Sequence, residues 1–184
     1  SIEAIEERGN VSTGKIIVRV IRVKQQALPG MPEDPQQDII SGFEIEDNGV
    51  GFDDNNYDSF RTSDSIYKLQ KGGKGIGRFS WLKAFNRADI KSVYQDGDQY
   101  KCRSFGFDVK EELPELAGVK TEGPPKTIVK LIGFKPEYRK LPSAYRTTEK
   151  IAQRILEQCI SFLMTNNKPQ ILLKDGEVEL SINT

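Results

Sequence analysis

Asp47-Asn48-Gly49-Val50-Gly51 (DNGVG) follows directly on residues 39–46 (IISGFEIE), an apolar stretch that predicts a β-strand. A carboxylate at the end of a strand can accept a hydrogen bond from an exocyclic amine. The two glycines let the backbone turn sharply and let a planar ring approach closely. DNGVG lacks the further acidic positions of a calcium-binding EF-hand loop, so calcium is disfavoured. Taken alone, the motif fits a nucleotide site and a simple turn equally well.

A second glycine-rich stretch, residues 72–77 (GGKGIG), lies immediately before a predicted helix at residues 78–88 (RFSWLKAFNRA). Successive small residues expose backbone N–H groups, and a helix N-terminus adds partial positive charge, so this stretch is suited to bind phosphates. Lys74 and Arg78 can add charge-assisted hydrogen bonds. It is not a P-loop, because no lysine follows the last glycine, and the polar loop before it disfavours a Rossmann motif. A flexible glycine hinge is the alternative.

The hydrophobic pattern outside these motifs predicts a single α+β domain. Strands are expected at residues 15–24, 39–46, 88–95, 98–109, 126–134 and on both sides of Asp175-Gly176, and helices at residues 1–8, 78–88 and 147–164. Asp96-Gly97 indicates a hairpin. Residues 53–71 have no clean periodicity, which indicates a mobile loop with one short helix around Ser65–Leu69. This order favours a two-layer α/β sandwich of the α+β class, with one mixed, mainly antiparallel sheet and helices on one face.

Composition excludes several classes of function. The 184 residues suffice for one domain, and 27 Lys and Arg balance 27 Asp and Glu, so charge does not indicate nucleic-acid binding. The chain has no histidine, which removes Ser-His-Asp and Cys-His catalysis and His-based metal sites. Cys102 and Cys159 lie far apart without CxxC spacing, so two buried free thiols in a reducing compartment are favoured over one disulfide. No apolar run reaches the roughly 18 residues of a membrane span, so we expect a cytoplasmic protein.

An Asp–Gly turn, a polar loop and a glycine-rich helix start together resemble the Bergerat ATP-binding fold. This fold is shared by gyrase B, MutL, histidine kinases and the ninety-kilodalton heat-shock chaperone. The first matching element is Asp47, Gly49 and Gly51, and the second is Gly73, Gly75 and Gly77. Thr127, in KTIVKLIGF at residues 126–134, resembles the Thr of the GTxIxL strand that supports the adenine-binding Asp.

The resemblance extends to both ends of the chain. Residues 1–4 (SIEA) are similar to the segment after the metal-binding Asn in the pattern ExxxN-[SA]-x-[DE]-A. The Asn and the general-base Glu would then precede Ser1, so we expect an N-terminally truncated ATP-binding domain of a larger, multidomain protein. Such a fragment would bind ATP or ADP weakly or not at all, and would hydrolyse ATP very slowly. The helix and strand after residue 147 resemble the end of the chaperone's ATPase domain, and this favours the chaperone-like branch over histidine kinases.

The resemblance implies a role for each matching residue. Asp47 would read the adenine amino group, with Gly51 and Phe52 near the base and with Glu3 and Ala4 lining the pocket. Residues 53–71 would form the ATP lid, in which Thr62 or Ser63 contacts phosphate. The phosphates would be held by the backbone amides of a segment that includes two charged side chains: Gly73, Lys74, Gly75, Ile76, Gly77 and Arg78. Mg²⁺ would neutralise the phosphate charge.

Three functions are compatible with these residues. The first is an ATPase domain that acts as a nucleotide-driven conformational switch in a larger protein. Its ligand would be an adenine nucleotide, and the protein could form a homodimer through this domain or through other domains. The second is the catalytic ATP-binding domain of a histidine kinase. The third is a nucleotide-sensing interaction module that does not hydrolyse ATP. The biological process stays open, because chaperones, DNA-repair proteins and topoisomerases carry the same module.

Overall fold

The computed structural model describes residues 1–9, 11–23, 39–62, 77–109, 113–139, 146–165 and 168–182. The short helix predicted around Ser65–Leu69, Ser63, and the glycine-rich stretch up to Ile76 lie outside these residues. The rest of the chain forms one eight-stranded sheet with helices packed on it.

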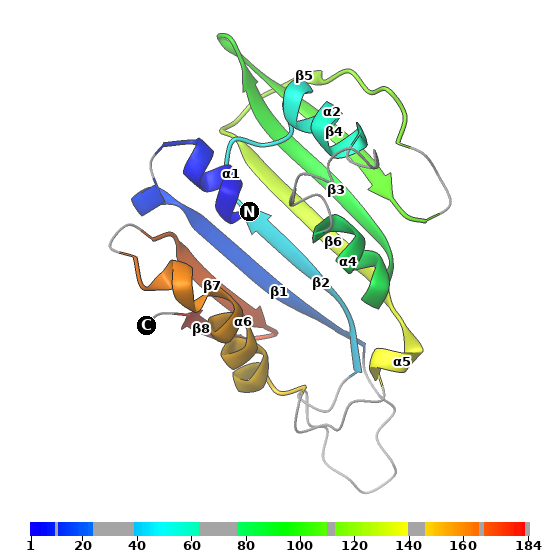
Figure 1. Ribbon diagram of the computed structural model, residues 1–184, viewed down its shortest axis with the longest axis vertical. Helices are drawn as coiled ribbons and strands as arrows, with labels where there is room; N and C mark the ends of the chain where they lie inside the picture. The colour runs from blue at the N-terminus through cyan, green and yellow to red at the C-terminus, as the bar shows by residue number, and fades with distance from the viewer. Residues whose placement is uncertain are drawn as a thin grey trace, which may run out of the picture.

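The sheet has the strand order β5-β4-β3-β6-β2-β1-β7-β8 (Figure 1). Every neighbouring pair is antiparallel except β1 and β7, which are parallel. The strands are β1 (Lys15–Val23), β2 (Ile39–Asp47), β3 (Phe85–Asp96), β4 (Gln99–Phe107), β5 (Val119–Thr121), β6 (Lys126–Phe134), β7 (Gln170–Asp175) and β8 (Val178–Ile182). The expected mixed, mainly antiparallel sheet is therefore confirmed.

The larger helices cover one face of this sheet, as the sequence pattern predicts. The helical segments are α1 (Ile2–Glu7), a 3₁₀ turn (Val11–Thr13), α2 (Asp54–Thr62), α4 (Gly77–Ala84), α5 (Pro136–Arg139) and α6 (Thr148–Leu163). Figure 1 shows α1, α2, α4 and α6 in front of the strands. No helix among the described residues is both long enough and apolar enough to cross a membrane.

Alternation along the strands sends apolar side chains to the helix face. One buried cluster gathers under α2 and α4 around Ile90, Phe105 and Val129. A second gathers under α1 and α6 around Ile16 and Leu173. The opposite face carries charged residues that pair across strands, as Arg19 does with Glu44 and Glu46 at 3.0 and 2.8 Å. Burial on one face fixes the register of each strand, because a slip by one residue would expose the apolar set.

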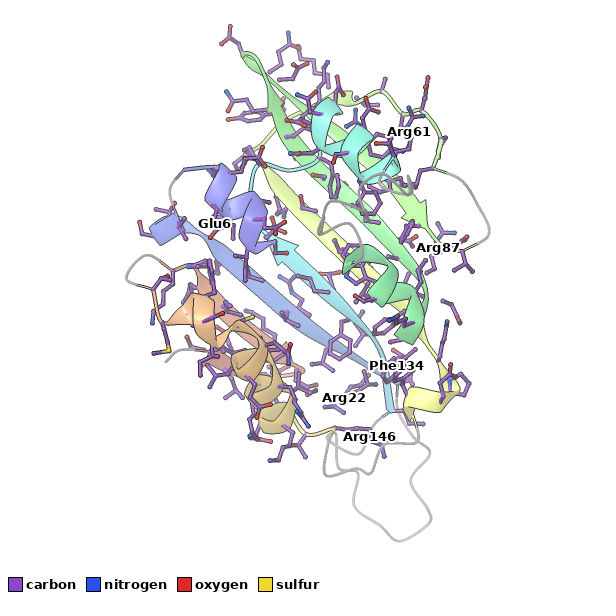
Figure 2. All side chains as sticks on the ribbon, viewed as in Figure 1. Glu6, Arg22, Arg61, Arg87, Phe134 and Arg146 are labelled. Atoms are coloured by element: carbon purple, nitrogen blue, oxygen red, sulfur yellow. The ribbon has the colours of Figure 1, made fainter. Side chains whose placement is uncertain are left out.

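A buried ion pair holds the N-terminal end of α6 against the sheet. Arg22 donates to both carboxylate oxygens of Asp175 at 2.7 and 2.6 Å and to the backbone oxygen of Arg146 at 2.7 Å. The hydroxyl of Thr148 donates to the same carboxylate at 2.7 Å. Figure 2 shows Arg22 and Arg146 close together at the end of the sheet.

The structure corrects three expectations. Residues 54–62, expected in a mobile loop, form α2, and Asp53 accepts a hydrogen bond from the backbone N of Asn56 at 2.7 Å. The helix expected at residues 78–88 ends at Ala84, and Phe85 begins β3. The short strand β5 lies between the strands expected at residues 98–109 and 126–134, where the sequence pattern predicts no strand. The hairpins predicted at Asp96-Gly97 and Asp175-Gly176 are both present, and each glycine has φ +58.

Candidate functional site

Asp47 is the last residue of β2, near the middle of the sheet, and its side chain is buried (4% exposed). It lies opposite Ile16 in β1 and Thr127 in β6. The carboxylate accepts one hydrogen bond on each oxygen, from Ser1 Oγ at 2.8 Å and from the backbone N of Gly49 at 3.0 Å. Two carboxylate oxygens offer about four acceptor positions. Asp47 therefore keeps acceptor capacity for a further donor.

Helix α1 packs directly on the loop that follows Asp47. The N-terminus lies beside the end of β2 (Figure 1), and the backbone N of Val50 donates to the backbone O of Ala4 at 3.0 Å. A Cβ built on Gly49 would lie 2.6 Å from the Cβ of Ala4. Gly49 is thus required by the close approach of the helix, and Ala4 is the α1 residue that packs on the loop.

The far end of the loop is held against β3. Gly51 has φ +83, and a Cβ there would lie 2.6 Å from the backbone O of Val93. The backbone N of Phe52 donates to Ser92 Oγ at 2.9 Å, and Ser92 Oγ lies 2.9 Å from Thr127 Oγ1. Asp47, Thr127 and Ser92 therefore form one row across β2, β6 and β3 in register.

Arg103 of β4 binds the chain where the loop leads into α2. Its Nη1 donates to the backbone oxygens of Phe52 and Asp53 at 2.7 and 2.8 Å, and its Nη2 bonds the carboxylate of Asp54. The hydrogen bond from Arg103 holds the pKa of Asp54 below its usual range. Because each of these partners is an oxygen, the buried cation (3% exposed) is well compensated.

The remaining predicted residues are less closely associated with Asp47. Glu3 is exposed on α1. The ring of Phe52 packs in an aromatic cluster, 5.3 Å from Phe60 and 5.5 Å from Phe105 between ring centroids. Thr62, at the end of α2, donates its hydroxyl to the backbone O of Asp58 at 2.6 Å.

The second glycine element is described only at its end. Gly77 and Arg78 form the start of α4, as predicted for a glycine-rich stretch that opens a helix. Gly73, Lys74, Gly75 and Ile76 lie outside the described residues. The resemblance also implies Mg²⁺. The described residues contain no group of three His, Cys, Asp or Glu that could hold a metal ion, so they do not by themselves form a site for it.

A separate hollow of about 510 Å³ lies on the face of the sheet opposite the helices. Its lining includes Glu44, Arg87, Asp89, Lys91 and Lys130. Arg87 pairs with Asp89, and Lys130 pairs with Glu44 at 3.0 Å, so these four charges compensate one another. The hollow is not adjacent to Asp47, which points to the other face.

Three residues of the site are given no role by the sequence motifs: Ser1, Ser92 and Arg103. The sequence does carry a signal for Arg103, because it alternates with Phe105 and Phe107 in β4 and so occupies an inward position. A charged residue at an inward position of a strand needs buried partners. Ser92 has no comparable signal, because its role depends on the pairing of β3 with β6.

Solved structures of similar fold include the Aquifex aeolicus MutL ATPase domain complexed with ADP, at 13% identity and a TM-score of 0.50. The 43K ATPase domain of Thermus thermophilus gyrase B, in complex with an aminocoumarin, has 15% identity and a TM-score of 0.55. The N-terminal domain of a DNA repair protein has 15% identity and a TM-score of 0.52.

These three structures match 98%, 99% and 98% of this chain, which spans 60%, 43% and 51% of theirs. Neither a known family model nor a curated protein matches the chain. At these identities the likeness concerns the fold alone. The two-layer fold expected from the sequence is thus that of the MutL and gyrase B ATPase domains.

Proposed function

We propose that this chain is the adenine-nucleotide-binding domain of an ATPase and acts as a nucleotide-driven conformational switch in a larger protein. The observation that carries the proposal is the buried Asp47 carboxylate, with acceptor capacity to spare, at the end of β2 beside Thr127. It is supported by the fold, which is similar to that of a MutL ATPase domain complexed with ADP.

Asp47 selects the base in this proposal. Each of its oxygens already accepts one hydrogen bond and can accept another. An ionised carboxylate has no hydrogen to donate, so the site can bind a further donor group but not an acceptor group. The exocyclic amine of adenine is a donor, whereas guanine presents a carbonyl oxygen at the same position. A buried carboxylate that faced this oxygen would be left with an unfavourable contact between two acceptors. The site therefore favours adenine, with Glu3, Ala4, Gly51, Phe52 and Thr127 around the base.

The phosphates would lie toward the start of α4. The described start of α4 at Gly77 places the positive end of a helix after the glycine-rich stretch. Residues 73–78 would supply backbone amides and the charges of Lys74 and Arg78. Thr62 at the end of α2 would have to give up its bond to Asp58 to reach a phosphate.

Helix α2 would couple the nucleotide to the rest of the protein as part of a lid at residues 53–71. The ring of Phe60 in α2 lies between Phe52 at 5.3 Å and Trp81 of α4 at 6.3 Å. A movement of Phe52 when the base binds would therefore be transmitted through Phe60 to both α2 and α4. The general-base Glu, Mg²⁺, a homodimer, a cytoplasmic location and the chaperone-like branch stay predictions from the sequence.

Calorimetric titration of the 184-residue chain with ADP and with GDP tests the proposal. We expect weak but measurable heat of binding with ADP and at least tenfold weaker binding of GDP, since one charge-assisted hydrogen bond is worth about 1.5 kcal/mol or more. Equal affinities for ADP and GDP would contradict the proposal that Asp47 selects adenine. ATP turnover by the full-length protein separates a hydrolysing switch from a sensor, and phosphate transfer to histidine identifies a kinase.

A further inference from the structure

The peptide groups on both sides of Phe52 are held by two buried side chains that face each other across β3 and β4. Ser92 accepts a hydrogen bond from the backbone N of Phe52 at 2.9 Å, and Arg103 donates to its backbone O at 2.7 Å. Ser92 and Arg103 are direct partners in the strand register. They are 0% and 3% exposed, so water does not replace either bond.

Ser92 also connects this peptide to Thr127. Its Oγ accepts the N–H of Phe52, and it shares a hydrogen bond of 2.9 Å with Thr127 Oγ1. If Ser92 donates its hydroxyl hydrogen to Thr127 Oγ1, that hydrogen and the N–H of Phe52 are both used. The hydroxyl hydrogen of Thr127 is then free to be donated to another acceptor. Thr127 lies opposite Asp47, so that hydrogen is available to the carboxylate or to a base bound there.

Arg103 extends the same support to α2. Its guanidinium bonds the backbone oxygens of Phe52, Asp53 and Leu116 and the Asp54 carboxylate. It also lies over the ring of Tyr57, 4.5 Å from the centroid. A planar fork with five donors can hold several oxygens at fixed angles, which an ammonium group cannot do.

We propose that Ser92 and Arg103 are positioning residues for the base end of the nucleotide site, an inference that rests on the proposed function. They do not touch the base in this arrangement. They fix the loop from Asp47 to Phe52 relative to Thr127, and Ser92 sets the direction of the Thr127 hydroxyl. Their loss weakens recognition of the base and leaves the contacts to the phosphates in place.

Ser92→Ala is the decisive variant, because it removes one oxygen and leaves the backbone unchanged. Affinities for ADP and IDP are measured by calorimetry, since IDP carries the same phosphates and a carbonyl in place of the adenine amine. We expect ADP to bind about three- to tenfold more weakly, as for loss of one buried hydrogen bond, and the preference for ADP over IDP to shrink. Ser41→Ala, which removes an exposed hydroxyl bonded to the backbone of Ile21, is the matched control.

Arg103→Lys keeps the charge and loses the fork, and it is expected to behave like Ser92→Ala with a larger loss. If it fails to fold, Ser92→Ala still decides the question. A merely structural role would weaken ADP and IDP equally, so an unchanged preference in Ser92→Ala overturns the positioning role while the proposed function stands. A wild-type chain that prefers neither nucleotide overturns the proposed function itself.

Discussion

Gly49→Ala tests whether the first glycine of the DNGVG loop is required by the packing of α1. The added Cβ would lie 2.6 Å from the Cβ of Ala4, 2.7 Å from its carbonyl carbon and 2.8 Å from its carbonyl oxygen. Carbon atoms prefer a separation of about 3.5–4.0 Å, so α1 must move by about 1 Å. Overpacking of this kind costs about 1–3 kcal/mol. Alanine also has less conformational freedom than glycine in the unfolded chain. Because φ of Gly49 is not positive, this effect stabilises the folded state by about 0.4–1 kcal/mol.

The expected net result is a free energy of unfolding lowered by about 1–2 kcal/mol, measured by urea denaturation followed by circular dichroism. Gly97→Ala is the control, because its Cβ would meet nothing within 4 Å and only its φ of +58 is unfavourable. Hydrogen exchange separates the two variants. The Val50 amide, bonded to the backbone O of Ala4, exchanges faster in Gly49→Ala only. A Gly49→Ala variant with wild-type stability and wild-type protection of Val50 would refute the packing argument.

Two further predictions concern the core. Burial alone would raise the pKa of Asp175, but the hydrogen bonds from Arg22 and Thr148 outweigh it and hold that pKa below its ordinary 3.8. The pair therefore stabilises the fold above about pH 4 and loses this contribution as the pH falls through the folded-state pKa. Asp175→Asn should cost about 3–5 kcal/mol at pH 7 and flatten the acid limb in urea titrations, and an unchanged acid limb would contradict it. Phe60 is only partly buried, so Phe60→Ala should lower the free energy of unfolding by about 3 kcal/mol, the low end for loss of a Phe side chain, and should shift the emission of Trp81 to the red. Unchanged fluorescence would mean that α2 and α4 are not in contact.

The strands and the position of Asp47 could be predicted because both are local properties of the sequence. Residues 15–24 are rich in β-branched residues, and β1 begins at Lys15 as predicted. The DNGVG motif places Asp47 at the end of a strand whatever the rest of the fold. Thr127 could be matched to it only through the resemblance, and in the structure the two residues are opposite each other in the register of β2 with β6.

The errors have tertiary causes. Residues 54–62 (DNNYDSFRT) are poor helix formers, and α2 depends on Tyr57, which is buried and donates its hydroxyl to the backbone O of Pro114 at 2.8 Å. Helix α4 ends at Ala84 because Lys135, after β6, bonds the backbone oxygens of Leu82 and Ala84 at 2.6 and 2.8 Å. Contacts of this kind join residues far apart in the sequence, so the hydrophobic pattern of the helix itself does not predict them.

Binding of ADP to Asp47→Asn, measured by calorimetry, tests the central claim most directly. The variant keeps the shape of the side chain and replaces a charged acceptor by a neutral amide, so we expect ADP affinity to fall roughly 10- to 100-fold, equivalent to about 1.5–3 kcal/mol. Asp98→Asn, in the exposed turn between β3 and β4, is the matched control and should bind ADP like the wild type. Undiminished ADP affinity in a folded Asp47→Asn variant would contradict the assignment of Asp47 as the group that reads the base.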